Sequence, residues 1–223
     1  MSIRSFVLRQ GRMTDGQERA FTTLWPRYGV ELVPGEKLSA QALFGRACDW
    51  VVEIGFGNGE TLVEMAAAAP DIGFLGIEVH RPGVGHAMLK AAEAGVGNLR
   101  IIRHDAVEVL RDYVEEASLA RVQVYFPDPW PKARHHKRRL IQAPFVDMLH
   151  AKLRAGGEVH CATDWEEYAY AMRDAFQNRQ KWRNVGRADG FADKPDFRPQ
   201  TKFERRGLGK GHGVWDVRHC AQK

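Results

Sequence analysis

The chain has 223 residues, the size of one domain with a substantial buried core. Hydrophobic residues make up 44% of it, yet no apolar run reaches the roughly 18 residues that a membrane-spanning helix needs. The net charge of +5 favours a polyanionic partner, and the absence of an apolar leader predicts a cytoplasmic protein that does not bind a membrane.

Residues 1–30 are basic and show no periodic apolar pattern, with arginines alternating with glycine and polar residues. We therefore expect a flexible basic N-terminal arm over residues 1–30 and a single domain over residues 31–223. The arm is either a solvated tail or a segment that becomes ordered when RNA or a cofactor binds. Three widely separated cysteines give neither a disulfide framework nor a zinc spacing, and we expect no metal site.

From Asp49 onward, expected strands alternate with expected helices. Strands are predicted at 50–54, 72–79, 99–103, 122–126 and 157–162, with a final pair near 182–187 and 213–220. Helices are predicted at 60–69, 84–94, within 106–116, at 139–153 and at 164–178, and Pro144 either kinks or begins the fourth of them. This alternation implies right-handed crossovers and a parallel sheet, so the fold class is α/β.

A glycine-rich loop follows the first expected strand, in Glu53-Ile54-Gly55-Phe56-Gly57-Asn58-Gly59. Glycines there let the backbone approach a ligand closely, and the next helix adds N–H donors at its start. The third glycine is misplaced for the dinucleotide pattern Gly-x-Gly-x-x-Gly. The carboxylate of Glu53 suits an ammonium group or a sulfonium-bearing amino acid better than a pyrophosphate.

Two further acids follow the next strands. Glu78 ends the second strand, where a carboxylate can accept both ribose hydroxyls of an adenosine. Asp105 follows the third strand, where it either accepts from an adenine amino group or caps the next helix. Acids at these three places favour S-adenosylmethionine over NAD.

The most informative segment runs from Phe126 to Arg139. Two prolines flank Asp128 and hold it on a stiff loop, and Trp130 offers either a stacking face or core filling. Residues 132–139 contain five Lys or Arg, two His and no acid, which indicates either phosphate contacts or a solvated helix start. One rigid carboxylate, one ring and a basic strip could grip a nucleotide within a larger RNA.

These segments resemble the bacterial tRNA (guanine-N7-)-methyltransferases. The similarity extends to Thr163-Asp164-Trp165-Glu166-Glu167-Tyr168, to Thr201-Lys202-Phe203-Glu204-Arg205-Arg206-Gly207, and to Gly211-His212-Gly213-Val214-Trp215-Asp216. It implies a Rossmann-like class I methyltransferase fold. Such a fold has a mostly parallel seven-stranded sheet with helices on both faces and an antiparallel last strand.

The resemblance also implies residue roles, with Asp128 as the catalytic position. The residues implied to hold S-adenosylmethionine are Glu53, Gly55, Gly57, Glu78, Asp105 and Asp128. Those implied to contact the substrate nucleotide are Lys132, Asp164, Thr201, Lys202, Phe203 and Glu204. Those implied to contact the RNA backbone are Arg134, His135, His136, Lys137, Arg138 and Arg139.

The implied acceptor is N7 of the variable-loop guanosine at tRNA position 46. Because N7 carries a free lone pair, no general base is needed to create the nucleophile. A carboxylate that accepts from N1–H and the exocyclic amine would recognise guanine, and the candidates for this role are Asp128, Asp164 and Glu204. Two alternatives stay open, a methyltransferase for another RNA and a non-catalytic tRNA-binding partner. We expect a monomer or homodimer with no obligate protein partner.

Overall fold

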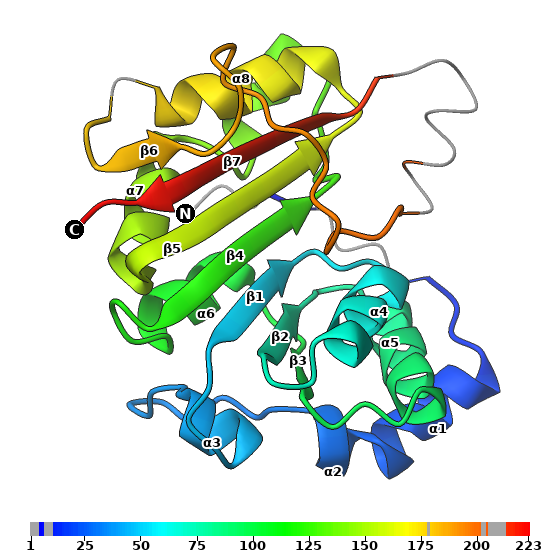
Figure 1. Cartoon of the computed structure of the whole chain (residues 1–223). Coiled ribbons are helices and arrows are strands. Elements are labelled where there is room, and N and C mark those ends of the chain that lie inside the picture. The colour runs from blue at the N-terminus through cyan, green and yellow to red at the C-terminus, as the bar shows by residue number, and fades with distance from the viewer. Residues whose placement is uncertain (1–4, 7–10, 178, 202–203, 205–212) are drawn as a thin grey trace.

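The computed structural model describes residues 5–6, 11–177, 179–201, 204 and 213–223, and these form a layered α/β structure around one sheet (Figure 1). The sheet has seven strands in the order β3-β2-β1-β4-β5-β7-β6. Their bounds are β1 Trp50–Ile54, β2 Gly73–Ile77, β3 Leu99–Ile102, β4 Leu119–Tyr125, β5 Leu153–Thr163, β6 Trp182–Asn184 and β7 Trp215–Ala221. Strands β1 to β5 pair in parallel, and β7 runs antiparallel to both neighbours. The fold class predicted from the sequence is therefore confirmed.

Helices cover both faces of the sheet (Figure 1). They are α1 Asp15–Thr23, α2 Trp25–Tyr28, α3 Ala40–Phe44, α4 Glu60–Ala68, α5 Arg81–Glu93, α6 Ala106–Asp112, α7 Ala143–Lys152 and α8 Glu166–Phe176, with a 3-10 helix η1 at Ala133–Arg138. One apolar cluster joins the sheet to α3, α6, α7 and α8, and a second joins it to α1, α2, α4 and α5. Apolar residues on alternating positions of the strands supply both clusters.

The expectation of an irregular segment up to residue 30 is wrong for residues 15–28, which form α1 and α2. Thr14 and Gln17 make a reciprocal capping box that starts α1. Ala20 and Tyr28 are fully buried, and the Tyr28 hydroxyl donates to the Val96 carbonyl at 3.1 Å. Each of these short helices thus buries one residue against the rest of the domain, which stabilises it beyond what its own sequence provides. The division of the chain at residue 30 stays a prediction.

The helix expected from residue 139 begins instead at Ala143, after η1. Pro144 lies in its first turn, where the missing N–H would have no helical partner in any case. The basic residues before it thus form a separate element between β4 and α7.

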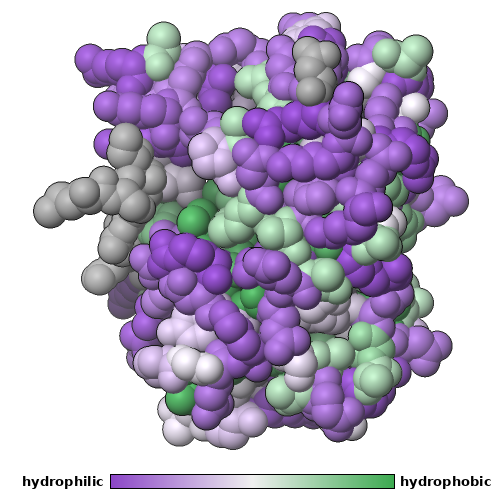
Figure 2. All heavy atoms as spheres, turned by 90° about the vertical axis from the view of Figure 1, so that its left-hand side faces the viewer, coloured by the Kyte–Doolittle hydropathy of each residue, from purple (hydrophilic) through white to green (hydrophobic). Residues whose placement is uncertain are grey.

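Figure 2 shows the side of the molecule toward the amino ends of the parallel strands, and hydrophilic residues cover most of it. Among the described residues, no helix combines the length and apolar character that a bilayer crossing requires.

Candidate active site

The carboxyl ends of β1, β4 and β5 meet at one edge of the sheet. Glu53 on β1 pairs in register with Gln123 on β4, which pairs with His160 on β5. Asp128 and Asp164 follow the ends of β4 and β5, so both emerge beside the glycine-rich loop. In an open α/β sheet this edge, where the strand order reverses, is where ligands bind.

A cavity of about 480 Å³ lies over the glycine-rich loop, within the size range of small-molecule sites. Gly55 and Gly57 have φ values of 72° and 61°, which favour glycine, and a side chain built on either would meet nothing within 4 Å. Among the other lining residues are Glu53, Tyr125 and Thr201. The loop thus presents bare backbone to open space, as a closely held ligand requires.

Glu53 is a buried acid in the wall of this cavity. Its side chain is 2% exposed, and Gln123 Nε2 donates to its Oε2 at 2.9 Å. Burial raises the pKa of Glu53 from its ordinary 4.5 to about 7, although the Gln123 hydrogen bond acts in the opposite direction. A cation entering the cavity would favour the ionised form and gain a charge partner.

Glu78 joins the end of β2 to the glycine-rich loop. Its Oε2 accepts from the Gly57 N–H at 2.9 Å, and its Oε1 accepts from the N–H groups of Val79 and His80 at 2.7 and 2.9 Å. Three of the roughly four acceptor sites of the carboxylate are thus occupied, and one remains on Oε2. Glu78 therefore fixes the loop and keeps one acceptor site for a ligand hydroxyl.

Asp105 is not among the residues that line the cavity over the glycine-rich loop. Its Oδ1 accepts from the Val107 N–H at 2.9 Å and caps α6, which is the alternative weighed from the sequence. It lines a second cavity of about 250 Å³, together with Lys137 and Arg138 of η1. Its contact with the cofactor stays a prediction.

The loop that carries Asp128 has unusual backbone geometry. Phe126 and Trp130 have φ values of 52° and 47°, which cost side-chain-bearing residues free energy and often mark functional sites. Asp128 between them is exposed, and within the described part of the chain it forms no hydrogen bond or ion pair. Its carboxylate is therefore open to a ligand.

Basic side chains surround Trp130 on this loop and on η1. The Arg138 guanidinium lies 4.9 Å from the Trp130 ring centroid, and the His135 ring meets its edge at 5.9 Å. Partial desolvation and the nearby cations, Arg134 first among them, lower the pKa of His135. Lys132, Arg134 and Lys137 are exposed. The predicted basic strip is thus present as a cationic surface.

Arg139 and His136 differ from the rest of the strip. Arg139 is 5% exposed; it donates to the Pro129 carbonyl at 2.8 Å and through both terminal nitrogens to Glu167 at 3.2 Å. His136 is half-buried and lies 3.6 Å from the same Glu167. A guanidinium this buried, with partners inside the protein, is poorly placed to reach a phosphate, which argues against the expected contact between Arg139 and RNA.

The predicted substrate residues near the C-terminus fall into three groups. Asp164 is half-buried and does not cap α8, whose cap residue is Trp165 without a side-chain bond. Lys202 and Phe203 lie outside the described residues. Glu204 is 5% exposed, with both oxygens bound by Arg198 at 2.7 and 3.1 Å. Because Arg198 occupies both oxygens, the geometry argues against base reading by Glu204 and favours Asp128 and Asp164 for that role.

The comparisons with known proteins agree with this geometry. The family described as "Putative methyltransferase" matches residues 48–217. The tRNA (guanine-N(7)-)-methyltransferase of Shewanella piezotolerans is 52% identical over 215 residues, which are 96% of this chain and 90% of the relative. That of Halorhodospira halophila is 52% identical over 214 residues, 96% of this chain and 93% of the relative. This chain belongs to the tRNA (guanine-N7-)-methyltransferase family.

Solved structures show the same fold at low identity. The 16S rRNA (adenine(1408)-N(1))-methyltransferase from Catenulisporales acidiphilia superposes with a TM-score of 0.54 at 17% identity, over 86% of this chain and 99% of the other. The 16S rRNA methyltransferase KamB gives 0.56 at 12% identity, over 96% and 97% of the two chains.

The cofactor of this family is S-adenosylmethionine, and the cavity fits it. The buried acid Glu53 suits a cationic amino acid portion, and Gly55 and Gly57 leave room above the loop. Glu78 retains one acceptor site, on Oε2, for a hydroxyl group. Shape, charge and acceptor capacity therefore agree with the ligand that the sequence motifs predicted.

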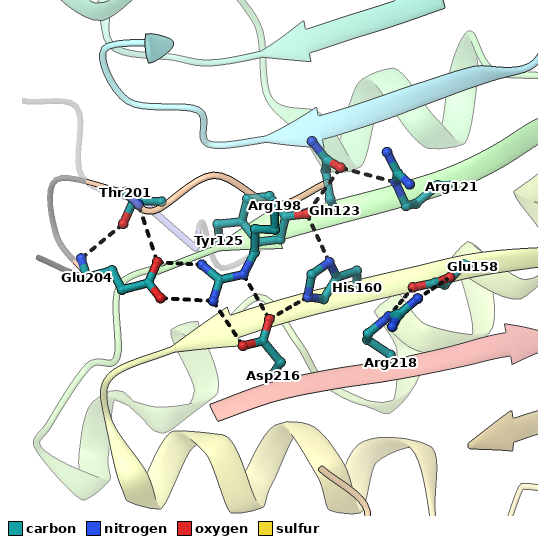
Figure 3. Close-up of polar contacts among 10 residues, drawn as sticks. All are labelled: Arg121, Gln123, Tyr125, Glu158, His160, Arg198, Thr201, Glu204, Asp216 and Arg218. Carbon is teal, nitrogen blue, oxygen red and sulfur yellow. Dashed lines mark hydrogen bonds and ion pairs between the residues drawn. The ribbon is translucent and has the colours of Figure 1, made fainter. Parts of the chain in front are cut away.

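Sequence reasoning missed a buried polar network beneath the cavity, formed by Gln123, Tyr125, His160, Arg198 and Asp216 (Figure 3). A signal was present in the strands, where Gln123 and His160 interrupt otherwise apolar runs. Arg198 and Asp216 gave no comparable signal, because charged residues in a loop or at a strand end are normally solvated.

Proposed function

We propose that this chain transfers the methyl group of S-adenosylmethionine to N7 of the guanosine at position 46, in the variable loop of tRNA. One observation carries the proposal. In a chain of this family, a cavity with a buried acid lies at the strand ends from which the open carboxylate of Asp128 and the cationic surface of η1 also emerge.

The cofactor would lie over the glycine-rich loop. Glu53 would hold its cationic portion, Glu78 a ribose hydroxyl, and the backbone at Gly55 and Gly57 would contact it directly. When bound, it supplies a methyl group already activated by a sulfonium.

The base would be held by Asp128 and Asp164. Guanine N7 carries a free lone pair, so these residues need only orient the base and stabilise the positive charge that it gains. A carboxylate that accepts from N1–H and the exocyclic amine also selects guanine over adenine, whose corresponding edge lacks that pair of donors. Methylation acidifies N1–H, so this hydrogen bond strengthens as the reaction proceeds.

The RNA backbone would lie across η1. Lys132, Arg134, Lys137 and Arg138 offer cations to phosphates, and neutralising phosphates releases counterions. The base must leave its tertiary contacts to reach the cavity, which costs a few kcal/mol. Thr201 would contact the nucleotide from the cavity wall.

The partner in this proposal is tRNA, and the location is the cytoplasm. The proposed assembly is a monomer or a homodimer without an obligate protein partner.

Mass spectrometry of nucleosides from an unmodified tRNA transcript, incubated with the protein and S-adenosylmethionine, tests the proposal. We expect 7-methylguanosine at position 46, a large loss with Asp128→Asn, and an unchanged yield with Asp71→Asn, an acid whose side chain is fully exposed. Methylation of another nucleotide or RNA would refute the substrate. Binding of tRNA and cofactor without any methylation would identify a non-catalytic tRNA-binding partner.

A further inference from the structure

A continuous polar network begins at the cavity wall and runs across the sheet (Figure 3). From Glu53 it passes to Gln123, whose Oε1 lies 3.2 Å from the Tyr125 hydroxyl. The same hydroxyl lies 2.9 Å from Nδ1 of His160, and His160 Nε2 donates to Asp216 Oδ1 at 2.6 Å. Four strands, β1, β4, β5 and β7, thus contribute to one series of polar contacts.

The network continues from the sheet into the C-terminal loop through Arg198. Its Nε and Nη2 donate to the two oxygens of Asp216 at 2.9 and 3.0 Å, while Nη1 and Nη2 donate to the two oxygens of Glu204 at 2.7 and 3.1 Å. The Glu204 N–H then donates to Thr201 Oγ1 at 3.0 Å, and the Thr201 N–H donates to Glu204 Oε2 at 3.3 Å. Since Thr201 lines the same cavity as Glu53, the network both begins and ends there.

Arg198 is the residue that joins the loop to the sheet. It is 1% exposed, and Asp216 and Glu204 are 3% and 5% exposed, so removing it would leave two buried carboxylates without a cation. Breaking such a pair costs far more than breaking an exposed one. The planar guanidinium binds both carboxylates bidentately, which a lysine cannot do.

The loop from Ala192 to Thr201 crosses the ends of β7 and β5 on this face of the sheet (Figure 1). Phe197 packs against Arg121, whose guanidinium lies 4.0 Å from the ring centroid, and against the edge of His160. A loop has fewer backbone hydrogen bonds than a helix, so the place of Thr201 depends on side-chain anchors. Among these anchors, Arg198 is the one that binds Glu204 beside Thr201.

We propose that Arg198 is a positioning residue for methyl transfer, which fixes Thr201 in the cavity wall by clamping Glu204 to Asp216. This rests on the proposed function, because Thr201 is there a substrate contact. It also gives Glu204 a different role from base reading: Glu204 acts through Arg198. A displacement of about 1 Å at a reacting centre can lower a rate about 100-fold.

The test compares Arg198→Met with Arg218→Met. Arg218 donates to both oxygens of Glu158 at 2.6 and 3.1 Å on neighbouring strands. It also touches the same loop, since its guanidinium lies 5.6 Å from the Phe197 ring centroid, but it does not contact Glu204 or Thr201. We expect kcat/KM for tRNA to fall about 100-fold in Arg198→Met, with the Kd for S-adenosylmethionine within about 3-fold of wild type, and to stay near wild type in Arg218→Met. Equal rates for the two variants would overturn the inference.

A double-mutant cycle tests the role of Glu204. If Glu204 acts through Arg198, Glu204→Gln added to Arg198→Met causes no further loss of kcat/KM. A further loss as large as that of Glu204→Gln alone would overturn the inference, since Glu204 would then act on the substrate independently.

Arg198→Lys keeps the charge but not the bidentate geometry, and should give an intermediate rate. If Arg198→Met does not fold, Arg198→Lys takes its place in the comparison and in the cycle, and a wild-type rate would overturn the inference. Failure of the wild-type protein to methylate tRNA is a separate result, which would refute the proposed function instead.

Discussion

Replacement of Glu53 by glutamine should stabilise the protein and weaken its binding of the cofactor. Glutamine has nearly the same shape and can still accept from Gln123 Nε2, so packing and the 2.9 Å hydrogen bond are retained. The substitution removes the ability of residue 53 to ionise, and burial makes a charge unfavourable at this position.

The size of the effect depends on pH. Because the folded-state pKa of Glu53 is raised from 4.5 to about 7, the folded protein holds this proton more tightly than the unfolded chain. The proton's contribution to stability is complete below pH 4.5 and is lost as pH rises through 7. At roughly 1.4 kcal/mol per pKa unit, the ionised acid costs about 3 kcal/mol above pH 8. Glu53→Gln should recover much of that at pH 8 and almost nothing at pH 4.5.

Urea unfolding of wild type and Glu53→Gln at pH 5 and pH 8 measures this difference, with exposed Glu116→Gln as a control for the lost charge. Titration calorimetry should show weaker cofactor binding by Glu53→Gln. It should also show that the affinity of the wild-type protein for the cofactor rises from pH 6 to pH 8. At pH 6 Glu53 is mostly protonated and must lose its proton before it can pair with a cationic ligand, whereas at pH 8 it is already ionised. A stability difference that is equal at the two pH values would refute the reasoning.

Three further predictions concern single side chains. Arg138→Ala should lower the slope of log K for tRNA against log salt concentration by about one, and an unchanged slope would exclude a phosphate contact. Arg139→Ala should leave that slope unchanged but lower the free energy of unfolding by about 2 kcal/mol, since its charged hydrogen bonds are internal. His219, buried and stacked on Phe176, has its pKa lowered from 6.5 to about 4, so its contribution to stability falls as pH falls through this range. His219→Phe should gain up to about 3 kcal/mol relative to wild type at pH 4, and no gain in acid unfolding would contradict this.

The sheet was predictable from the sequence because its strands are short apolar runs and its glycine-rich loop breaks one of them sharply. α1 and α2 were not, because few apolar residues mark them. Ala20 and Tyr28 become buried only when distant segments pack against them, as the hydrogen bond from Tyr28 to the Val96 carbonyl shows. The start of α7 at Ala143 followed a local rule, the preference of proline for the first turn.

The sequence predicted the parts of the candidate site that depend on residue type and on position relative to the strands. Glu53, Gly55 and Gly57 line one cavity, as their spacing implied. Burial was not predictable: Arg139 and Glu204 look in the sequence like ordinary surface charges, yet each is 5% exposed and ion-paired. Whether a charge faces solvent or a buried partner depends on contacts between segments far apart in the chain.

Two arginines that are buried in the described part of the chain have the same task on the two loops that flank the cavity. Arg139 binds the Pro129 carbonyl within the loop that carries Asp128, and Arg198 binds Glu204 beside Thr201. A loop that approaches a ligand cannot devote its backbone to regular hydrogen bonding, and a guanidinium with five donors can hold several groups at once. The cationic side chains of the candidate site therefore fall into a group at the surface and a buried pair. Exposed cations such as Arg134 and Lys137 should govern tRNA affinity and its salt dependence, whereas the buried pair should govern the geometry of the reaction, measured as kcat.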